Sequence, residues 1–536
     1  MKKLNYILIF VLICVLNMKA QLSSVANEVY LAKVEVEGSP AIIDLSGNYV
    51  VRPGIYEAIY FDRFSEGLCP VKRNGKEGFI DIYGHEVIPC IWRWVWKFER
   101  GLASVGVDYG DGYNFLRGYI NRNGKVIVEP KYSWVELVKG ADLIRTEGPA
   151  CLYNFNGDLL INDVFSVQQI CHDGMLLISR NGNFGGYFFV DSTGKKKLKN
   201  FYDVREFSGG YAVALIRDEV KGNQSGYIDS DGNQYIVGKY EDLNNFRNGY
   251  AIVGSQDNKK GIINNMFKEI IPPAYDEISG LDFHNRDILF VNDFCQVMKD
   301  DKKALINTKG EIIVPFGTYS RFEMRGSNKV IEASTYNRYE HKDQKGKINS
   351  SGNTHVLIDL SGKRLTEYEY EYEYINNFYQ GFAAVNRDGK NGFVNEKGEE
   401  VIPSIYKFDD IVGERVNKEF VELGVIRVKK DGKWGLLNRK GELIVPYIYD
   451  KIEAFNENVA VVKQNNRYGA INNYGELIIP TQYFPESITG KFNGGRLGVR
   501  KRTTEGIKVG YINKEGELVI PYVFDKVYPF MKVSFN

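Results

Sequence analysis

One short phrase recurs thirteen times along the 536-residue chain: an apolar run, then an Asn or Asp, and in twelve copies a Gly three residues further on. The anchoring residues are Asp44, Asp81, Asn121, Asn154, Asp191, Asp229, Asn264, Asn307, Asp359, Asn395, Asn438, Asn472 and Asn513. Self-similarity at intervals of mostly 33 to 43 residues is typical of a repeat array. Such a chain folds as a series of similar small units and needs no single large core.

The repeated residues predict the turn that each unit contains. The side-chain oxygen of Asn or Asp can accept a hydrogen bond from the backbone two residues on, and Gly supplies the left-handed backbone that closes the turn. This combination is typical of a hairpin with a type I turn and a Gly bulge. Phe267 replaces the Gly in the seventh copy, so that hairpin is expected to be looser or to have another geometry.

The segments around each turn read as short strands. The residue before every anchoring Asn or Asp is aliphatic or aromatic, and β-branched residues follow the turn until a Pro such as Pro446 or Pro480 ends the run. An Ala/Val-rich strand recurs between the hairpins, as in Phe455 to Val462, and a Tyr/Phe-Asp pair such as Tyr449-Asp450 precedes it. We expect this aromatic residue to pack between units and the Asp to cap a turn. Each unit therefore has three or four strands.

One copy resembles a known family. The phrase GKWGLLNRKG from Gly432 to Gly441, followed by Ile444-Val445-Pro446, is similar to the bacterial WG (KWG) β-repeat family. Only this unit keeps the Trp-Gly dipeptide, but the surrounding Gly, Asn/Asp and Pro positions largely persist in the others. The resemblance implies a β-rich repeat protein of a kind common among exported bacterial proteins, with no shared catalytic apparatus.

The predicted fold is all-β, a tandem array of about 13 short antiparallel meander or hairpin repeats. We favour an open twisted array over a closed β-propeller, because the repeat interval varies and thirteen units make an awkward single ring. The strand-like ends, Leu31 to Val36 and Met531 to Phe535, could cap an open array or complete a shared blade. Eight units occupy residues 21–325 and five occupy 355–536, with a polar insertion at 326–354.

The N-terminus predicts export. Lys2 and Lys3 precede an apolar run from Tyr6 to Leu16, and Ala20 ends a segment typical of a secretory signal peptide at residues 1–20. We expect a periplasmic, extracellular or cell-surface location and no transmembrane segment in the mature chain. The net charge of +1 does not indicate a nucleic-acid partner.

The sequence contains no recognisable catalytic motif. The five His are scattered, the Cys match no metal-binding motif, and the notable Asp residues belong to the turns. The sequence therefore predicts no catalytic residue, no cofactor and no metal, and a protein that is not an enzyme.

Two departures from the repeat are candidates for a binding surface. Four aromatic residues, Trp92, Trp94, Trp96 and Phe98, alternate with other residues. This would place them on one strand face, either as core or as an exposed platform for sugar rings or a protein anchor. The core interpretation is favoured, since large aromatics are usually at least partly buried. The second departure is EYEYEYEY from Glu367 to Tyr374, a half-buried strand or an acidic ridge for a basic partner; its aromatic positions are Tyr368, Tyr370, Tyr372 and Tyr374.

The leading functional hypothesis is a non-enzymatic scaffold that binds a protein or glycan of the bacterial envelope. One alternative is a glycan-active enzyme with its site in a channel or in irregular loops. The other is a structural spacer, which would lack aromatic or charged patches.

Overall fold

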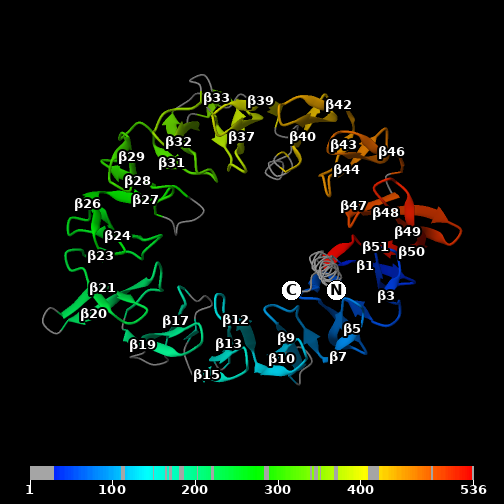
Figure 1. Ribbon diagram of the computed structural model, residues 1–536, viewed down its shortest axis with the longest axis horizontal. Helices are drawn as coiled ribbons and strands as arrows, with labels where there is room; N and C mark the ends of the chain where they lie inside the picture. Colours follow the sequence, from blue (N-terminus) through cyan, green and yellow to red (C-terminus); the bar gives the residue numbers. More distant parts are fainter. Residues whose placement is uncertain are drawn as a thin grey trace, which may run out of the picture.

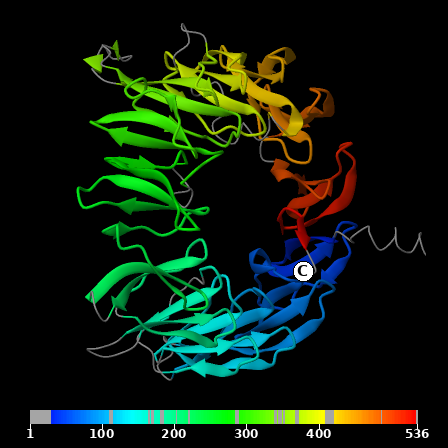
Figure 2. The ribbon, with the colours of Figure 1, turned by 60° about the vertical axis from the view of Figure 1, so that its left-hand side comes forward.

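The computed structural model describes residues 29–109, 115–148, 150–162, 166–167, 172–179, 186–201, 203–218, 222–282, 289–337, 341–342, 348–349, 352–366, 372–407, 420, 422–484 and 487–533. The strands form small antiparallel sheets that follow one another around a ring (Figures 1 and 2). Among the described residues thirteen sheets make the ring, and the hairpin β33–β34 lies between two strands of one of them. The predicted all-β repeat array is confirmed.

The first six sheets lead from the N-terminus through the first part of the ring. Their strands are β1 (Val29–Val36), β2 (Ser39–Asp44) and β3 (Tyr49–Val51); β4 (Ala58–Ile59), β5 (Leu68–Arg73), β6 (Lys76–Asp81) and β7 (Glu86–Trp92); β8 (Trp94–Val95), β9 (Leu102–Asp108), β10 (Phe115–Asn121) and β11 (Val126–Tyr132); β12 (Trp134–Leu137), β13 (Leu143–Glu147), β14 (Cys151–Asn154) and β15 (Leu159–Ile161); β16 (Ser166–Val167), β17 (Met175–Ser179), β18 (Tyr187–Asp191) and β19 (Lys196–Phe201); β20 (Tyr211–Asp218), β21 (Gly222–Asp229) and β22 (Gln234–Ile236). A short 3-10 helix, η1 (Phe61–Arg63), follows β4.

The remaining sheets complete the ring. Their strands are β23 (Asp242–Leu243), β24 (Tyr250–Gly254), β25 (Lys260–Asn264) and β26 (Glu269–Tyr275); β27 (Glu277–Ser279), β28 (Phe294–Lys299), β29 (Lys302–Asn307) and β30 (Ile312–Val314); β31 (Arg321–Glu323), β32 (Val330–Asn337) and β35 (Gly352–Asp359), with β33 (His341–Lys342) and β34 (Ile348–Asn349) between the last two; β36 (Tyr374–Ile375), β37 (Phe382–Arg387), β38 (Lys390–Asn395) and β39 (Glu400–Lys407); β40 (Val425–Lys430), β41 (Lys433–Asn438) and β42 (Leu443–Tyr449); β43 (Lys451–Ile452), β44 (Val459–Gln464), β45 (Arg467–Asn472) and β46 (Leu477–Tyr483); β47 (Ile488–Asn493), β48 (Arg496–Thr503), β49 (Gly506–Ile512) and β50 (Leu518–Phe524); and β51 (Lys526–Val527) with β52 (Met531–Val533).

A complete sheet has four strands that pair in chain order, with the short first strand towards the centre of the ring and the last strand at the periphery. Figure 1 shows this for β12 and β15 and for β47 and β50. The segment 326–354, expected as an insertion, contains all of β32 and the start of β35, and the hairpin β33–β34 lies between them. No helix within the described ranges is long and apolar enough to cross a membrane.

The predicted Asn/Asp turn joins two adjacent strands in each of the thirteen units. In all thirteen copies the Oδ1 oxygen of Asn or Asp accepts hydrogen bonds from the backbone N–H groups two and four residues on, at 2.8 to 3.1 Å. The Gly three residues on has the left-handed backbone, as Gly441 with φ of 78° illustrates. The turn chemistry inferred from the sequence is confirmed.

The expectation of a different hairpin at Phe267 is wrong. Phe267 has φ of 59°, and its N–H donates to the Asn264 carbonyl at 2.8 Å as Gly does elsewhere. Its ring packs among aromatic residues of the preceding and the same sheet, stacking on Tyr235 at 4.8 Å between centroids and lying 5.2 Å from Tyr211. These contacts offset the cost of the left-handed backbone, which is about 1 to 2 kcal/mol for a residue with a Cβ.

The sheets pack face to face, and the core lies between them. The buried apolar side chains form thirteen clusters, each shared by two neighbouring sheets. In β44, Ala460 and Val462 belong to the cluster with the preceding sheet, while Val459 and Val461 belong to the cluster with the following one. Because both faces of such a strand are buried, it is apolar throughout instead of alternating. Thirteen sheets with thirteen interfaces require a closed ring, since an open row would have twelve.

The two ends of the chain close the ring in one shared sheet. β1 pairs with β2 on one side and with β51 and β52 on the other. The N–H groups of Asp525 and Tyr528 donate to carbonyls of β1 at 3.0 and 3.1 Å. Asp450 and Glu453 make the same two bonds to β44 inside an ordinary sheet, at 2.8 and 2.9 Å. The C-terminal segment therefore supplies the first strand that the N-terminal sheet lacks.

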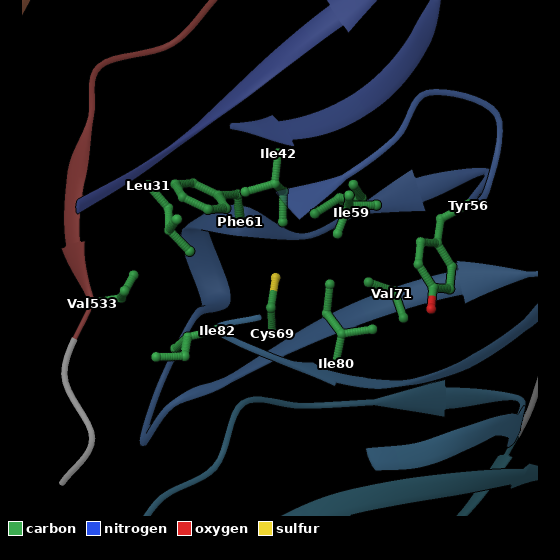
Figure 3. Packing of buried hydrophobic residues seen from close by; sticks show 11 residues of the cluster. Leu31, Ile42, Tyr56, Ile59, Phe61, Cys69, Val71, Ile80, Ile82 and Val533 are labelled. Atoms are coloured by element: carbon green, nitrogen blue, oxygen red, sulfur yellow. The ribbon is translucent and has the colours of Figure 1, made fainter. Parts of the chain in front are cut away.

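The preference for open ends is consequently wrong, and the closed alternative describes the structure. The physical reason is that neither end carries a polar cap. Val533 from the last strand packs beside Leu31 in a cluster that also holds Cys69 and Ile80 of the next sheet (Figure 3). On the other face, Ala32 and Val34 belong to a cluster with residues of the last full sheet. An open array would expose both of these apolar faces to water.

Candidate binding surface

The Trp-rich segment crosses from one sheet to the next. Trp92 ends β7 and pairs with Glu77, whereas Trp94 begins β8, the innermost strand of the following sheet. Trp92 is 9% exposed, Trp94 is half-buried, and Trp96 is 43% exposed. The expectation of a single aromatic face is therefore wrong, because the chain leaves one strand and enters another between the first two Trp residues.

The two less buried Trp residues form a stack with a neighbouring Phe. The rings of Trp94 and Trp96 lie 6.1 Å apart between centroids with their planes 23° from parallel. Phe115, at the start of β10, lies 5.5 Å from Trp94. Gly106 leaves room for this contact, since a Cβ there would lie 3.1 Å from Phe115 and 3.4 Å from Trp94.

Two arginines extend the stack across three adjacent sheets. The guanidinium carbon of Arg63 lies 4.6 Å from the ring centroid of Trp96 and 4.8 Å from that of Tyr60. The guanidinium carbon of Arg117 lies 4.8 Å from the rings of both Phe115 and Trp134. We call this row the aromatic–arginine ladder; it consists of Tyr60, Arg63, Trp96, Trp94, Phe115, Arg117 and Trp134.

Trp134 occupies the position in its sheet that Trp94 occupies in the preceding one. Each opens the innermost strand and precedes a fully or largely buried Val, which is Val135 or Val95. The Trp134 side chain is 43% exposed, and its Nε1–H donates to Glu136 at 3.1 Å. The rings of Trp96 and Trp134 are thus exposed, but their neighbours hold them in place.

Sequence reasoning found only part of this surface. An alignment of the units on their turns would have shown that Trp134 matches Trp94. Arg63, Phe115 and Arg117 carried no signal in the sequence, because their contacts join different sheets.

A cavity adjoins the Arg117 end of the ladder. It has a volume of about 510 Å³ and is open to solvent; its lining residues are Tyr109, Phe115, Leu116, Arg117, Lys131, Ser133 and Gly148. Tyr109 at its edge is 62% exposed. The surface therefore combines flat exposed rings with a neighbouring concavity.

The charged groups on this surface differ in whether they have a partner of opposite charge. Arg63, Lys97, Arg117 and Lys131 have no carboxylate partner among the described residues. Asp108, by contrast, is paired with Arg93 at 2.9 Å and with Lys76 at 3.6 Å. Apart from Asp62, which follows Phe61 in η1 and has no ion-pair partner among the described residues, the unpaired charges named along the ladder are cationic.

The Tyr-rich segment does not form an exposed surface where it is described. Tyr372 is 1% exposed and belongs to a core cluster between two sheets. Tyr374 is half-buried, and its hydroxyl donates to Asn391 at 2.7 Å. Tyr368 and Tyr370 lie outside the described residues.

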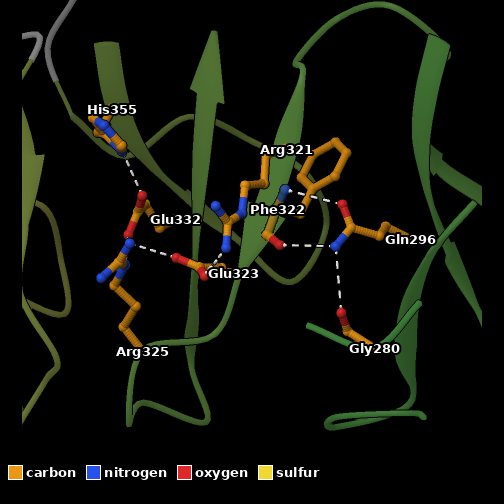
Figure 4. Close-up of polar contacts among 8 residues, drawn as sticks. All are labelled: Gly280, Gln296, Arg321, Phe322, Glu323, Arg325, Glu332 and His355. Atoms are coloured by element: carbon orange, nitrogen blue, oxygen red, sulfur yellow. Dashed lines mark hydrogen bonds and ion pairs between the residues drawn. The ribbon is translucent and has the colours of Figure 1, made fainter. Parts of the chain in front are cut away.

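A cluster of buried charges lies elsewhere in the ring (Figure 4). In the sheet β31–β32–β35, the Glu332 carboxylate contacts His355 and Arg325, and Glu323 contacts Arg325 and Arg321. Both carboxylates are almost completely buried, so each needs a cation to remain charged. Their saturation by these partners is typical of a structural ion network. Across the described ranges, no group of three His, Cys, Asp or Glu side chains could hold a metal ion.

The sequence matches the profile of a known repeat family. The sequence profile described as "WG containing repeat" matches nine segments that together cover more than half of the chain; they are residues 42–76, 78–109, 118–141, 226–259, 261–285, 357–390, 392–434, 434–468 and 510–532. No functionally curated protein matches the chain.

Solved structures resemble the chain only distantly. A eukaryotic initiation factor has 11% identity and a TM-score of 0.29 over 70% of this chain and 95% of its own. BamB from Moraxella catarrhalis has 13% identity and a TM-score of 0.20 over 52% of this chain and 93% of its own. AztD from Citrobacter koseri has 13% identity and a TM-score of 0.23 over 63% of this chain and 93% of its own. Likeness at this level says nothing about function.

Proposed function

Because the chain belongs to the family of WG-containing repeat proteins, we propose that it is an exported, non-enzymatic ring scaffold that binds a glycan of the bacterial envelope through the aromatic–arginine ladder. The observation that carries the proposal is the state of Trp96 and Trp134. Each leaves 43% of its surface exposed, although most of the described large aromatic side chains are buried or half-buried. Rings that are exposed and also fixed in orientation can stack on a sugar ring with little loss of side-chain entropy.

A protein partner is the second candidate for the same surface. Trp and Arg are the residues that most often dominate protein interfaces, and the ladder is rich in both. The glycan is favoured because the exposed rings stand in a row beside an open cavity. A protein interface of standard size would need a broader apolar centre.

Export and the absence of catalysis are parts of the proposal that rest on separate observations. The basic and apolar leader at residues 1–20 supports export. Fractionation of cells that produce the full chain should then recover it outside the cytoplasm with a shortened N-terminus.

The absence of catalysis is supported by the buried carboxylates Glu323 and Glu332, which are occupied by Arg and His partners. Glycan hydrolysis that is lost on changing a carboxylate would refute this part.

The binding proposal is tested with envelope glycans immobilised on an array and with envelope extracts. We expect the mature protein to bind glycans on the array. Trp96→Ala and Trp134→Ala should each weaken binding about tenfold or more, as is usual when an aromatic side chain covered by the ligand is removed. Tyr474→Ala is the control, since Tyr474 is 75% exposed on a turn far from the ladder in sequence. Retention of a protein alone, lost in the Trp variants, would replace the glycan with a protein partner. Equal binding by all variants would exclude the ladder.

A further inference from the structure

We infer that the bound glycan is an acidic polysaccharide, a chain of sugar units that carry carboxylate groups, which the ladder engages by stacking and by its arginines together. This inference rests on the proposed glycan-binding function and narrows it to one chemical class. Its basis is the placement of cations between the rings.

The arginines lie where a charged sugar would meet them. Arg63 lies beside Tyr60 and Trp96, and Arg117 lies beside Phe115 and Trp134. A guanidinium that packs flat on a ring keeps its N–H groups directed outward at its edge, where they match a carboxylate. Among the described residues, Arg63 has no hydrogen-bond acceptor of its own, so these donors are available to a ligand.

The surrounding charges leave a local positive excess. Glu136 and Glu147 lie near Trp134 and share Arg145, so these three residues together keep one negative charge. Asp108 is likewise occupied by Arg93 and Lys76. Lys131 lines the same cavity as Arg117 and adds one exposed cation, and the exposed Lys97 directly follows Trp96 in the chain. Since the whole chain has a net charge of only +1, this excess is a property of the surface and not of the overall composition.

The ladder also indicates an extended ligand. Its residues come from three sheets in succession, which are β4–β7, β8–β11 and β12–β15. Neighbouring sheets that pack face to face are about 10 Å apart, which exceeds the width of one sugar ring. A chain of several units can therefore contact Trp96 and Trp134 at once, whereas a single sugar contacts one of them.

The test compares each acidic polysaccharide with its own uncharged form. Alginate, polygalacturonate and hyaluronate are titrated into the mature protein by calorimetry, alongside the same chains with their carboxyl groups reduced to alcohols. We expect at least one acidic chain to bind about tenfold more tightly than its reduced form, with affinity that falls as salt rises from 50 to about 300 mM. Arg63→Gln and Arg117→Gln should each weaken binding of the acidic chain about fivefold more than they weaken binding of its reduced form.

Control variants and the remaining outcomes separate the two levels of the proposal. Arg500→Gln, an exposed arginine on the opposite side of the ring closure, should have no effect. Circular dichroism confirms that each variant is folded. If charged and reduced chains bind equally and the arginine variants bind normally, the acidic class is wrong while glycan binding stands. Failure to bind any glycan overturns both proposals, and tighter binding of a single-stranded oligonucleotide than of any glycan overturns them as well.

Discussion

At the scale of single residues, the choice between Asn and Asp in each turn is limited by the residue four positions later. One side-chain oxygen always accepts two backbone N–H bonds, which either residue can do. The other terminal atom of the side chain differs between the two residues. The Nδ2 of Asn438 donates a hydrogen bond to the Glu442 carboxylate at 2.7 Å, whereas the Oδ2 of Asp229 accepts one from the Asn233 side chain at 2.8 Å. No Asp in these turns has an acidic residue four positions on. The repeat therefore excludes Asp opposite an acidic residue, whereas Lys four positions on accompanies both Asp, at Asp191 and Asp359, and Asn, at Asn121 and Asn264.

This pairing predicts that Asn438→Asp destabilises its hairpin and Asn264→Asp does not. The first change places two carboxylates against each other, at positions 438 and 442. The second places a carboxylate beside Lys268. We expect a loss of about 0.5 to 1 kcal/mol for Asn438→Asp at pH 7, relieved below about pH 4 as one carboxylate gains a proton. Amide hydrogen exchange of the turn measures the local effect, and equal protection of both variants at pH 7 would refute the rule.

Phe267 shows the same dependence on context at a position that requires a left-handed backbone. Phe267→Gly removes the backbone strain but also the contacts with Tyr235, Tyr211 and their neighbours. Loss of a partly buried aromatic outweighs the strain, so we expect a net loss of about 1 to 2 kcal/mol. Thermal unfolding of the variant should begin at a lower temperature than that of the natural protein. A variant that is more stable would show that strain dominates at this turn.

At the scale of strands and hairpins, one ion pair explains two residues of the repeat. The Lys that precedes the Trp position pairs with the Asp of the Tyr/Phe-Asp phrase, seventeen residues later. The three described copies are Lys259–Asp276, Lys433–Asp450 and Lys508–Asp525. The same carboxylate reaches the hairpin turn of the following sheet, since the Oδ2 of Asp276 accepts from the backbone N–H of Asp300 at 2.9 Å. The Asp therefore caps a turn, as the sequence suggested, and ties the end of one sheet to the next.

These carboxylates make stability depend on acidity. The Lys hydrogen bond, followed for Asp276 and Asp525 by a backbone hydrogen bond, holds the pKa of Asp276, Asp450 and Asp525 below the ordinary value. A group whose folded pKa is lowered contributes stability that is present above its unfolded pKa of about 3.9 and is lost as pH falls through the folded pKa. The melting temperature should therefore fall below about pH 4.

The variant Asp276→Asn isolates the contribution of one such pair. Asn keeps an acceptor oxygen but loses the charge, so the variant should melt lower than the natural protein at pH 7 and approach it near pH 3. Asp231→Asn serves as the control, since Asp231 carries no such ion pair in the structure described. Parallel melting curves for Asp276→Asn and the natural protein at all pH values would exclude the pair as a source of the acid sensitivity.

At the scale of the whole molecule, the sequence predicts the unit better than the arrangement of units. The hairpins were predictable because Asn/Asp, Gly and Pro act on the backbone within a few residues. Closure was not, since it depends on contacts such as that of the Asp525 carboxylate with the Glu37 N–H at 2.6 Å, 488 residues apart in the chain. The Trp92 to Trp96 pattern misled for a related reason: a strict alternation of residues implies one face only while the chain stays in one strand. The ladder depends on Arg63 and Arg117, whose partners become neighbours only when the sheets stack.

Closure predicts that the last twelve residues hold the ring together without being needed for the other sheets. A chain that ends at Phe524 lacks β51 and β52, so β1 loses its inner partner and the faces that contain Leu31 and Val34 become exposed. Because each sheet packs mainly on its neighbours, the remaining sheets should stay folded while the ring opens. We expect a larger radius of gyration by small-angle X-ray scattering and faster amide exchange in β1. A chain that ends at Phe530 is the matched control: it keeps β51 and should remain closed, with exchange increased only near Val29. If the shorter chain keeps the dimensions and the β1 protection of the full protein, the prediction is wrong. Packing between the first and last sheets would then close the ring without the pairing of β51 and β52 with β1.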